Sequence, residues 1–263
     1  MRIIGIDLAW GERNPDGLAL IEVTFEGEAI LSWTGSAMGD GALTAWLDDI
    51  AGAESALLAL DGPIICENPT GARPVDREAH RRFGRAHAGC YPANLTRCPR
   101  PNRLRRRLEA LGYRTDFRLQ EPRQASDETG EPLRRLIEVY PHPAILALFD
   151  LDHIIRYKKG SAADRGRELR RCQRLLGKTL SRMNPPVRIG EMVHRIFAED
   201  PATLRGVARK RHEDTLDAIV CALVGWIHWS HGGQRSEVLG DLQSGFIVVP
   251  LADGAVGDAW TTS

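Results

Sequence analysis

Short apolar stretches in the first sixty residues alternate with polar turns in a pattern typical of strands. The stretches at 2–10 and 18–23 flank the turn-rich sequence GERNPDG, so we expect two strands there and a third at 28–33. Apolar residues then recur at helical spacing over 41–51, and the compact sequence SALLAL at 55–60 predicts a buried strand. Three strands, a helix and a strand predict an α/β fold in which the first and fourth strands lie side by side.

Helical patterns dominate the second half of the chain. The sequence LIEVYPHPAILALF at 136–149 predicts a strand followed by a helix that has Pro143 in its first turn. A long helix should begin near Glu213, be buried because it is apolar on most faces, and end at Gly232. Further expected elements are helices at 165–183 and 191–199 and a closing strand at 245–250.

Between residues 68 and 132 the sequence is rich in proline, glycine and arginine and has no long apolar run. We therefore expect an arginine-rich insertion outside the main core, within a single domain of residues 1–263. Eleven arginines against two acids give the segment 73–107 a net charge of +9. The whole chain has 35 basic and 35 acidic residues, so the remainder carries −9.

Composition narrows the class of protein. The chain has 263 residues, of which 43% are hydrophobic, so it can bury a sizeable core and does not resemble a disordered or collagenous protein. Its net charge of zero excludes a protein that coats nucleic acid by uniform positive charge. The five cysteines form no C-x-x-C pair, so we expect reduced thiols, no disulfide-linked partner and a cytoplasmic location. The longest apolar run, 218–229, has 12 residues, and a membrane span needs about 18.

Acidic residues occur where the sequence predicts buried elements. Asp7 follows RIIGI, Asp61 follows SALLAL, and Glu138 lies within LIEV. Asp214 and Asp217 are three residues apart and therefore share one face of the last long helix. A carboxylate removed from water is costly unless it is paired, hydrogen-bonded or bound to a metal. Because clustered carboxylates repel one another and a divalent cation relieves that repulsion, we expect these acids to share a metal.

Each of these acids also has an ordinary structural explanation. Asp7 could end a strand and hold a loop, and Asp61 precedes Gly-Pro as a turn residue does. Asp214 could cap a helix, and Glu138 could pair with an arginine. His142, in the sequence YPHP, could carry a proton or could be purely structural. The sequence leaves these alternatives open.

Basic residues supply candidate contacts to nucleic acid. The run RCPRPNRLRRR at 97–107 could bind phosphates, or it could be a solvated helix face. Two lysines that follow His142 in the chain could contact phosphates as well. The candidate contacts are Arg97, Arg100, Arg103, Arg105, Arg106, Lys158 and Lys159.

Four motifs carry a resemblance to a known family. GIDLAW at 5–10, LALDGPI at 58–64, EVYPHPA at 138–144 and DTLDAIVCA at 214–222 resemble the family called domain of unknown function 429. The resemblance covers nearly the whole chain and implies a predicted nuclease with a ribonuclease H-like fold. That fold would be a mixed five-stranded sheet flanked by helices, with the basic insertion and extra helices added.

The resemblance also implies a site and a reaction. Asp7, Asp61 and Asp217, with Asp214 beside them, would bind two divalent ions, Mg²⁺ or Mn²⁺, and Glu138 would join them as a catalytic residue. The leading hypothesis is a metal-dependent hydrolase of DNA or RNA phosphodiesters, in which one ion activates water and the other stabilises the leaving oxygen.

Two other functions remain possible at this point. A module of the same fold could bind nucleic acid or a protein without cleaving it, and the arginine-rich segment fits this function equally well. An ATP-binding phosphotransferase of the actin and sugar-kinase type would also begin with an acid after the first strand. The sequence DLAWGERNPDG lacks the compact Gly-Thr or Gly-Ser phosphate loop that such enzymes need, which argues against this alternative.

Overall fold

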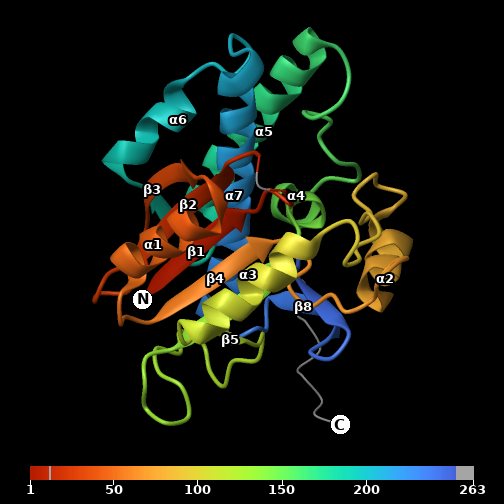
Figure 1. Ribbon diagram of the computed structural model, residues 1–263. Coiled ribbons are helices and arrows are strands. Elements are labelled where there is room, and N and C mark those ends of the chain that lie inside the picture. Colours follow the sequence, from red (N-terminus) through yellow and green to blue (C-terminus); the bar gives the residue numbers. More distant parts are fainter. Residues whose placement is uncertain (12, 253–263) are drawn as a thin grey trace.

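The computed structural model describes residues 1–11 and 13–252, and these residues form one mixed sheet covered by helices (Figure 1). Nine strands, seven α-helices and one 3-10 helix occur in this part of the chain. The predicted α/β class is confirmed. None of the described helices combines the length and the apolar character needed to cross a bilayer.

Five strands form the centre of the sheet. β1 (Arg2–Asp7) pairs antiparallel with β2 (Asp16–Val23), which pairs antiparallel with β3 (Ala29–Ala37). On its other side β1 pairs in parallel with β4 (Ala56–Asp61), and β4 pairs in parallel with β6 (Arg134–Val139). The predicted contact between the first and fourth strands is thus confirmed. Helices cover both faces here, which explains why β1 and β4 have continuous apolar sequences.

Four more strands enlarge the sheet beyond the predicted five. β7 (Val187–Ile189) pairs with β3, and both β5 (Arg114–Thr115) and β9 (Gly245–Pro250) pair with β6. β8 (Ser236–Asp241) pairs with β9, so the order is β7-β3-β2-β1-β4-β6-β9-β8. β9 was expected from the sequence. β5, β7 and β8 were not, because these strands are very short or half exposed and lack an apolar run.

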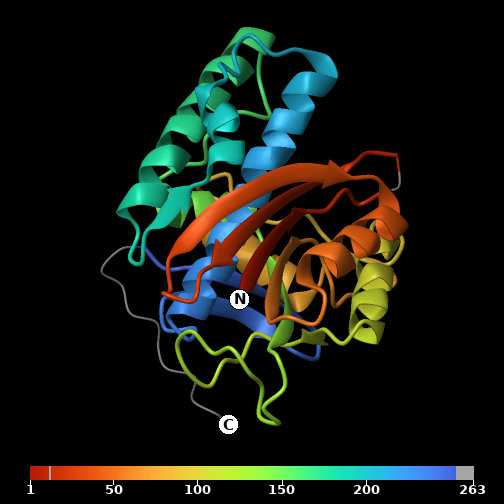
Figure 2. The same ribbon diagram turned by 90° about the vertical axis from the view of Figure 1, so that its left-hand side faces the viewer.

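Helices form a layer on each face of the sheet (Figure 2). α7 (Gly206–Ser230) packs against β1, β2 and β4, next to α4 (Pro141–Phe149) and α5 (Ala162–Arg182). α1 (Gly39–Ala51) and α3 (Pro99–Ala110) cover the opposite face. α7 begins well before the expected start near Glu213, because its first two turns are polar and show no apolar periodicity.

Smaller elements complete the two layers. α2 (Pro74–Phe83) packs against β8 and β9 at one edge of the sheet. The single helix expected at 191–199 is instead a short 3-10 helix, η1 (Glu191–Val193), followed by the five-residue α6 (His194–Ala198).

Part of the arginine-rich insertion, from α3 onwards, packs into the main core, whereas its sequence predicts a segment outside that core. Leu104 and Leu108 of α3, together with Tyr113 and Phe117 after it, are buried in the same apolar cluster as the central strands. The two leucines lie four residues apart and face the sheet, while arginines occupy the other sides of the helix. A single narrow apolar face anchors this segment to the core. The segment therefore has no long apolar run in its sequence that would reveal its burial.

Glycines allow the backbone of α7 to touch the sheet directly. A Cβ atom at Gly5 of β1 would lie 2.0 Å from the carbonyl oxygen of Ala218, and one at Gly17 of β2 would lie 2.3 Å from that of Asp214. Gly225 does the same from the helix side, since a Cβ there would lie 2.9 Å from Ile3. Only glycine permits so close an approach. The acidic turn of α7 is therefore held against the ends of β1 and β2.

Candidate active site

Two of the predicted acids are direct neighbours at the carboxyl ends of parallel strands. Asp7 of β1 and Asp61 of β4 occupy the same register position. Neighbouring strands lie about 4.8 Å apart, and residues in register point to the same face. Gly5 and Asp7 share a face of β1, and Gly5 contacts α7, so both carboxylates face α7.

The acids of α7 lie opposite this pair. The backbone of Asp214 contacts Gly17, which pairs with Asp7 across the sheet. Asp217, one turn further along the helix, is 1% exposed. The structure thus brings together Asp7, Asp61, Asp214 and Asp217, which we call the acid cluster.

Burial and mutual repulsion raise the pKa values of the two strand acids. Burial raises the pKa of Asp7 well above its ordinary value, and the charges of Asp217, Asp61 and Asp214 raise it further. Burial is also the largest cause for Asp61, whose pKa is raised to about 7. Carboxylates with such pKa values retain protons at pH values where ordinary aspartates are ionised, unless a cation joins them.

A lysine of the protein supplies that cation. The Nζ atom of Lys158 lies 2.6 Å from Oδ2 of Asp217, and the hydroxyl of Tyr157 donates a hydrogen bond of 2.5 Å to Oδ1. Burial lowers the pKa of Lys158, but the charges of Asp217 and Asp7 outweigh burial and raise it overall. The same ammonium group lowers the pKa values of Asp7 and Asp61. Asp214 pairs separately with Lys210.

The donor chemistry of the acid cluster suits a hard divalent cation, but its present geometry suits Lys158. Four carboxylates are the ligands that Mg²⁺ and Mn²⁺ prefer. Within the described residues, however, no three or more aspartate, glutamate, histidine or cysteine side chains converge closely enough to hold a metal ion. The partner of buried Oδ2 of Asp217 is the ammonium group of Lys158. A metal could use this oxygen only after Lys158 withdrew.

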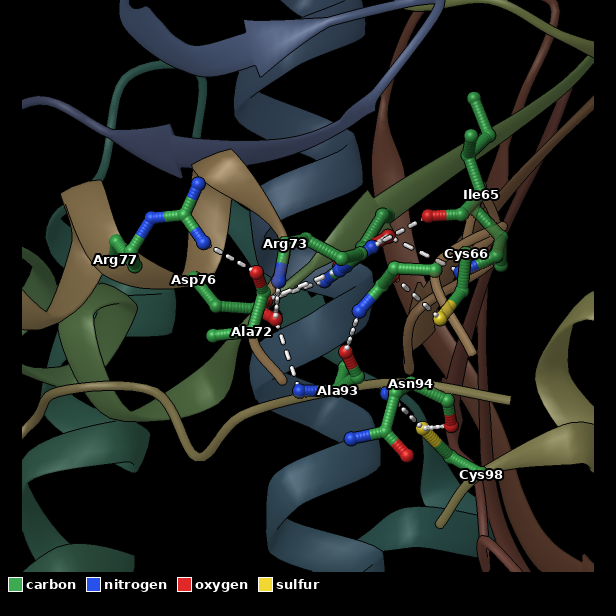
Figure 3. A network of polar contacts seen from close by, with 12 residues as sticks. Ile65, Cys66, Ala72, Arg73, Asp76, Arg77, Ala93, Asn94 and Cys98 are labelled. Carbon is green, nitrogen blue, oxygen red and sulfur yellow. Dashed lines mark hydrogen bonds and ion pairs between the residues drawn. The ribbon is translucent and has the colours of Figure 1, made fainter. Parts of the chain in front are cut away.

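Glu138 is held by an arginine rather than by the acid cluster. Its two oxygens accept hydrogen bonds of 2.6 and 2.8 Å from Arg73, and Oε2 also accepts one from the backbone of Ile64. Arg73 binds Asp76 and the carbonyl oxygen of Ile65 as well (Figure 3). Burial raises the pKa of Glu138 to about 7 although Arg73 opposes this. The arginine pairing considered from the sequence is what the structure contains, and it fixes the start of α2.

A cleft of about 850 Å³ lies beside the acid cluster. Lys158 and His142 line it, together with Arg77 and Arg81 of α2 and with Arg156 and Lys159 of the loop between α4 and α5. A smaller pocket is lined by Asp61 and shares Asp76, Cys90, Tyr91 and Tyr140 with the cleft. The acid cluster therefore borders a surface rich in positive charge.

His142 stands at the start of α4 and lines the cleft. The hydroxyl of Tyr140 lies 3.1 Å from Nδ1 of His142. Burial lowers the pKa of His142 to about 4, and the charges of Lys158 and Lys159 contribute. The imidazole is therefore neutral near pH 7 and a weak base. Withdrawal of Lys158 would raise its pKa.

The arginines predicted in α3 and just before it lie elsewhere. Arg100, expected to contact nucleic acid, is 2% exposed and binds Asp16 at 2.7 Å and Asp40 at 2.8 Å, so it is a structural residue. Arg103 also contacts Asp40, and Arg105 pairs with Glu109. Arg97 and Arg106 are exposed. None of these five is among the residues that line the cleft.

Sequence reasoning missed several residues of the cleft, above all Arg77, Arg81, Tyr91 and Arg156. The first two were counted only as part of the basic segment, although they lie four residues apart and therefore share a face of α2. That spacing was the signal available for finding them. Tyr91 and Arg156 lie outside the helices and strands and carry no periodic signal.

Comparison with known proteins gives one match. A family model described as "Protein of unknown function (DUF429)" matches residues 5–243, a range that includes the acid cluster and the cleft. No curated protein and no solved structure matches the chain.

Proposed function

We propose that this chain, which belongs to the DUF429 family, is a hydrolase that cleaves phosphodiester bonds of nucleic acid with divalent cations. One observation carries the proposal. Asp7 and Asp61 are paired at the ends of parallel strands, opposite Asp217 and beside a basic cleft. A cluster of carboxylates that repel one another next to cations that attract phosphate is the arrangement that metal-assisted phosphodiester hydrolysis requires.

The proposed fold class is ribonuclease H-like. The direct pairing of the first strand with the fourth, the antiparallel first three strands, and the acids on β1, β4 and α7 support it. The additional edge strands and α2 would then be elaborations of that core. Because a shared fold does not establish a shared function, the proposal rests mainly on the site.

In this proposal Asp7, Asp61 and Asp217 hold Mg²⁺ or Mn²⁺, and Asp214 supports them from the same turn of α7. The bound cations would activate a water molecule and stabilise the leaving oxygen. Side chains of the protein would orient the acids and attract the substrate. Tyr157 orients Asp217, while Arg77, Arg81 and Lys159 attract the phosphates of the substrate. His142, which lines the cleft, remains the candidate proton carrier.

Cleavage assays with single-stranded, duplex, hybrid and branched nucleic acids, each with Mg²⁺, Mn²⁺ or Ca²⁺, test this proposal. We expect the parent chain to cleave with Mg²⁺ or Mn²⁺ and to turn over little with Ca²⁺, whose coordination is looser. Asp7→Asn and Asp217→Asn should lose cleavage and still fold. Asp49→Asn, an exposed acid of α1, is the matched control and should keep it. Cleavage that survives in both site variants would contradict the proposal.

The ion pair between Lys158 and Asp217 favours a second candidate function, a module that binds nucleic acid without cleaving it. In such a module the lysine would permanently take the place of a metal. Isothermal titration with Mn²⁺ separates the two candidates. Binding of nucleic acid without any Mn²⁺ binding or cleavage would support the module, whereas Mn²⁺ binding that requires Asp7 and Asp61 would support the hydrolase.

A further inference from the structure

The cleft beside the acid cluster combines two kinds of surface. Its lining is mainly apolar and includes Tyr140, Tyr91 and Ile155. Cationic side chains reach it from α2 and from the loop before α5, among them Arg77 and Arg81. A ligand that fits must offer a flat apolar part and negative charge together. A nucleotide with an accessible base has both.

Tyr91 links this cleft to the acids. Tyr91 is 67% exposed, so its ring is accessible to a ligand. Tyr91 lines the cleft and also the smaller pocket to which Asp61 contributes. Trp10, three residues after Asp7 and 39% exposed, lines the same small pocket. Two accessible aromatic residues thus line the small pocket to which Asp61 contributes.

We propose that the cleft binds an unpaired segment of nucleic acid and that Tyr91 stacks on a base of that segment. This inference rests on the proposed function and specifies its substrate class. Proteins that bind single strands combine a basic groove for the backbone with aromatic rings that stack on bases. A base on Tyr91 leaves its phosphate between the cations of the cleft and the acid cluster.

The size of the cleft argues for unpaired bases in particular. Its volume of about 850 Å³ is that of a small-ligand pocket and suits one or two nucleotides. A double helix keeps its bases paired and stacked inside, so it does not offer single bases to a space of this size. The faces of bases inside a duplex are also covered by their neighbours, so Tyr91 could not stack on them.

Fluorescence anisotropy with labelled strands of about 12 nucleotides, in EDTA to prevent turnover, tests the inference on the full chain. We expect single-stranded DNA or RNA to bind at least about tenfold more tightly than the same sequence as a duplex. Tyr91→Ala should weaken binding of the single strand by about tenfold or more, and Tyr91→Phe should restore it because the ring is kept. Stacking on Tyr91 should quench the fluorescence of a 2-aminopurine base placed in the strand. This quenching should be lost with Tyr91→Ala and kept with Tyr91→Phe.

Phe25→Ala is the matched control, since Phe25 is a fully exposed aromatic residue in the turn between β2 and β3, at the opposite end of β1 from the acids. It should bind like the parent. Equal affinity for duplex and single strand, or unchanged binding and quenching with Tyr91→Ala, would overturn the inference. A mononucleotide that competes at the same concentration as the strand would also overturn it, because the cleft would then be a site for small nucleotides.

These outcomes are separate from those of the cleavage assay. Tyr91-dependent binding of single strands without cleavage would leave the inference intact and reject the hydrolase. Metal-dependent cleavage that is equally fast with Tyr91→Ala and on duplexes would support the hydrolase and reject the inference.

Discussion

Lys158 decides the charge state of the acid cluster. Its ammonium group lies 2.6 Å from Asp217 and stabilises the ionised forms of Asp7 and Asp61. The lysine stands on the loop between α4 and α5, and its side chain is 40% exposed. Such a side chain can leave the acids without disturbing a helix or strand, so in the proposed function Lys158 and a divalent cation would compete for the same carboxylates.

Lys158→Met should therefore have opposite effects on stability and on metal binding. Methionine keeps the apolar stem but removes the charge, so in EDTA the acids repel one another more strongly and Tm should fall. Mn²⁺ should bind about tenfold more tightly, because it no longer has to displace the ammonium group. Differential scanning fluorimetry with and without Mn²⁺ measures both effects.

Lys159→Met provides the control for this change. Lys159 is the next residue, is exposed and lines the same cleft, but it is Lys158 that pairs with Asp217. We expect little change in Tm or in Mn²⁺ affinity. If Lys158→Met bound Mn²⁺ no better than Lys159→Met, competition between lysine and metal would be disproved.

Asp61 should make stability depend on pH in a direction unusual for an aspartate. Burial raises its pKa from 3.8 to about 7, so between these values the folded chain keeps a proton that the unfolded chain has lost. The free energy of unfolding without metal thus loses a contribution as pH rises through about 7. Asp61→Asn removes that loss, and its Tm relative to the parent should rise between about pH 4.5 and pH 8.

Thermal unfolding in EDTA across this pH range measures the difference between variant and parent. Using the difference cancels contributions from other titrating groups, such as His142 and His228, whose lowered pKa values act in the opposite direction. Asp49→Asn, on the exposed side of α1, should show no such trend. A difference in Tm that is constant with pH would contradict the raised pKa of Asp61.

Among the elements, α7 is positioned by contact of its backbone with β1 and β2. Gly5→Ala places a methyl group where the carbonyl oxygen of Ala218 lies 2.0 Å away, so the helix must move. We expect the free energy of unfolding to fall by more than about 3 kcal/mol, because backbone cannot give way as a side chain can. Urea unfolding measures the loss, and Mn²⁺ affinity should fall with it as the acids separate.

Gly41→Ala is the corresponding control in α1. A Cβ atom at Gly41 would meet nothing within 4 Å, and the position is helical. Alanine favours a helix by up to about 1 kcal/mol over glycine, so this variant should be as stable as the parent or slightly more stable. A loss of stability as large as that of Gly5→Ala would show that the close contact is not the cause.

The central elements could be predicted from the sequence, while the partners of single charges could not. Asp7 and Asp61 each end an apolar run, so their position at the strand ends was visible. Glu138 looked the same in the sequence, but Arg73, which binds it, lies 65 residues away in a segment without a matching signal. Lys158 was expected to contact phosphate, and only the folded loop reveals that its charge lies among the acids.

At the scale of the whole molecule, much of the positive charge of the segment 73–107 is used inside the structure. Arg73 neutralises Glu138 and Asp76, and Arg100 neutralises Asp16 and Asp40. A local charge of +9 therefore does not describe the surface that a ligand meets. The arginine count in the sequence does not distinguish buried arginines from the arginines of α2 that line the cleft.

Arg100→Met should destabilise the chain without changing its affinity for nucleic acid. Asp16 is 0% exposed, and losing its partner leaves a buried charge unpaired, which costs about 3–5 kcal/mol. Arg106→Ala, at an exposed position of the same helix, should cost less than about 0.5 kcal/mol. Chemical denaturation compares the two. Equal stability of both variants would show that the Arg100 ion pairs are dispensable.

Salt dependence locates the surface that binds nucleic acid. Replacing both Arg77 and Arg81 with alanine should reduce the slope of log affinity against log salt by roughly one for each phosphate that the chain no longer neutralises. Replacing Arg103 and Arg106 together should leave the slope nearly unchanged, because neither residue is part of the cleft lining. Anisotropy titrations at several salt concentrations give these slopes. A reduced slope after replacement of Arg103 and Arg106, with an unchanged slope after replacement of Arg77 and Arg81, would place the binding surface on α3.

In the proposed function, the position of Lys158 would also make metal and substrate binding thermodynamically dependent on each other. The lysine is both a counterion of the acids and part of the lining of the cleft. Once a divalent cation replaces it, its ammonium group is released towards the surface where phosphates bind, so each metal ion bound strengthens the attraction for an anionic strand. By reciprocity the strand must strengthen metal binding by the same factor. The site would therefore fill cooperatively, because the metal and the strand would each bind more tightly when the other is present.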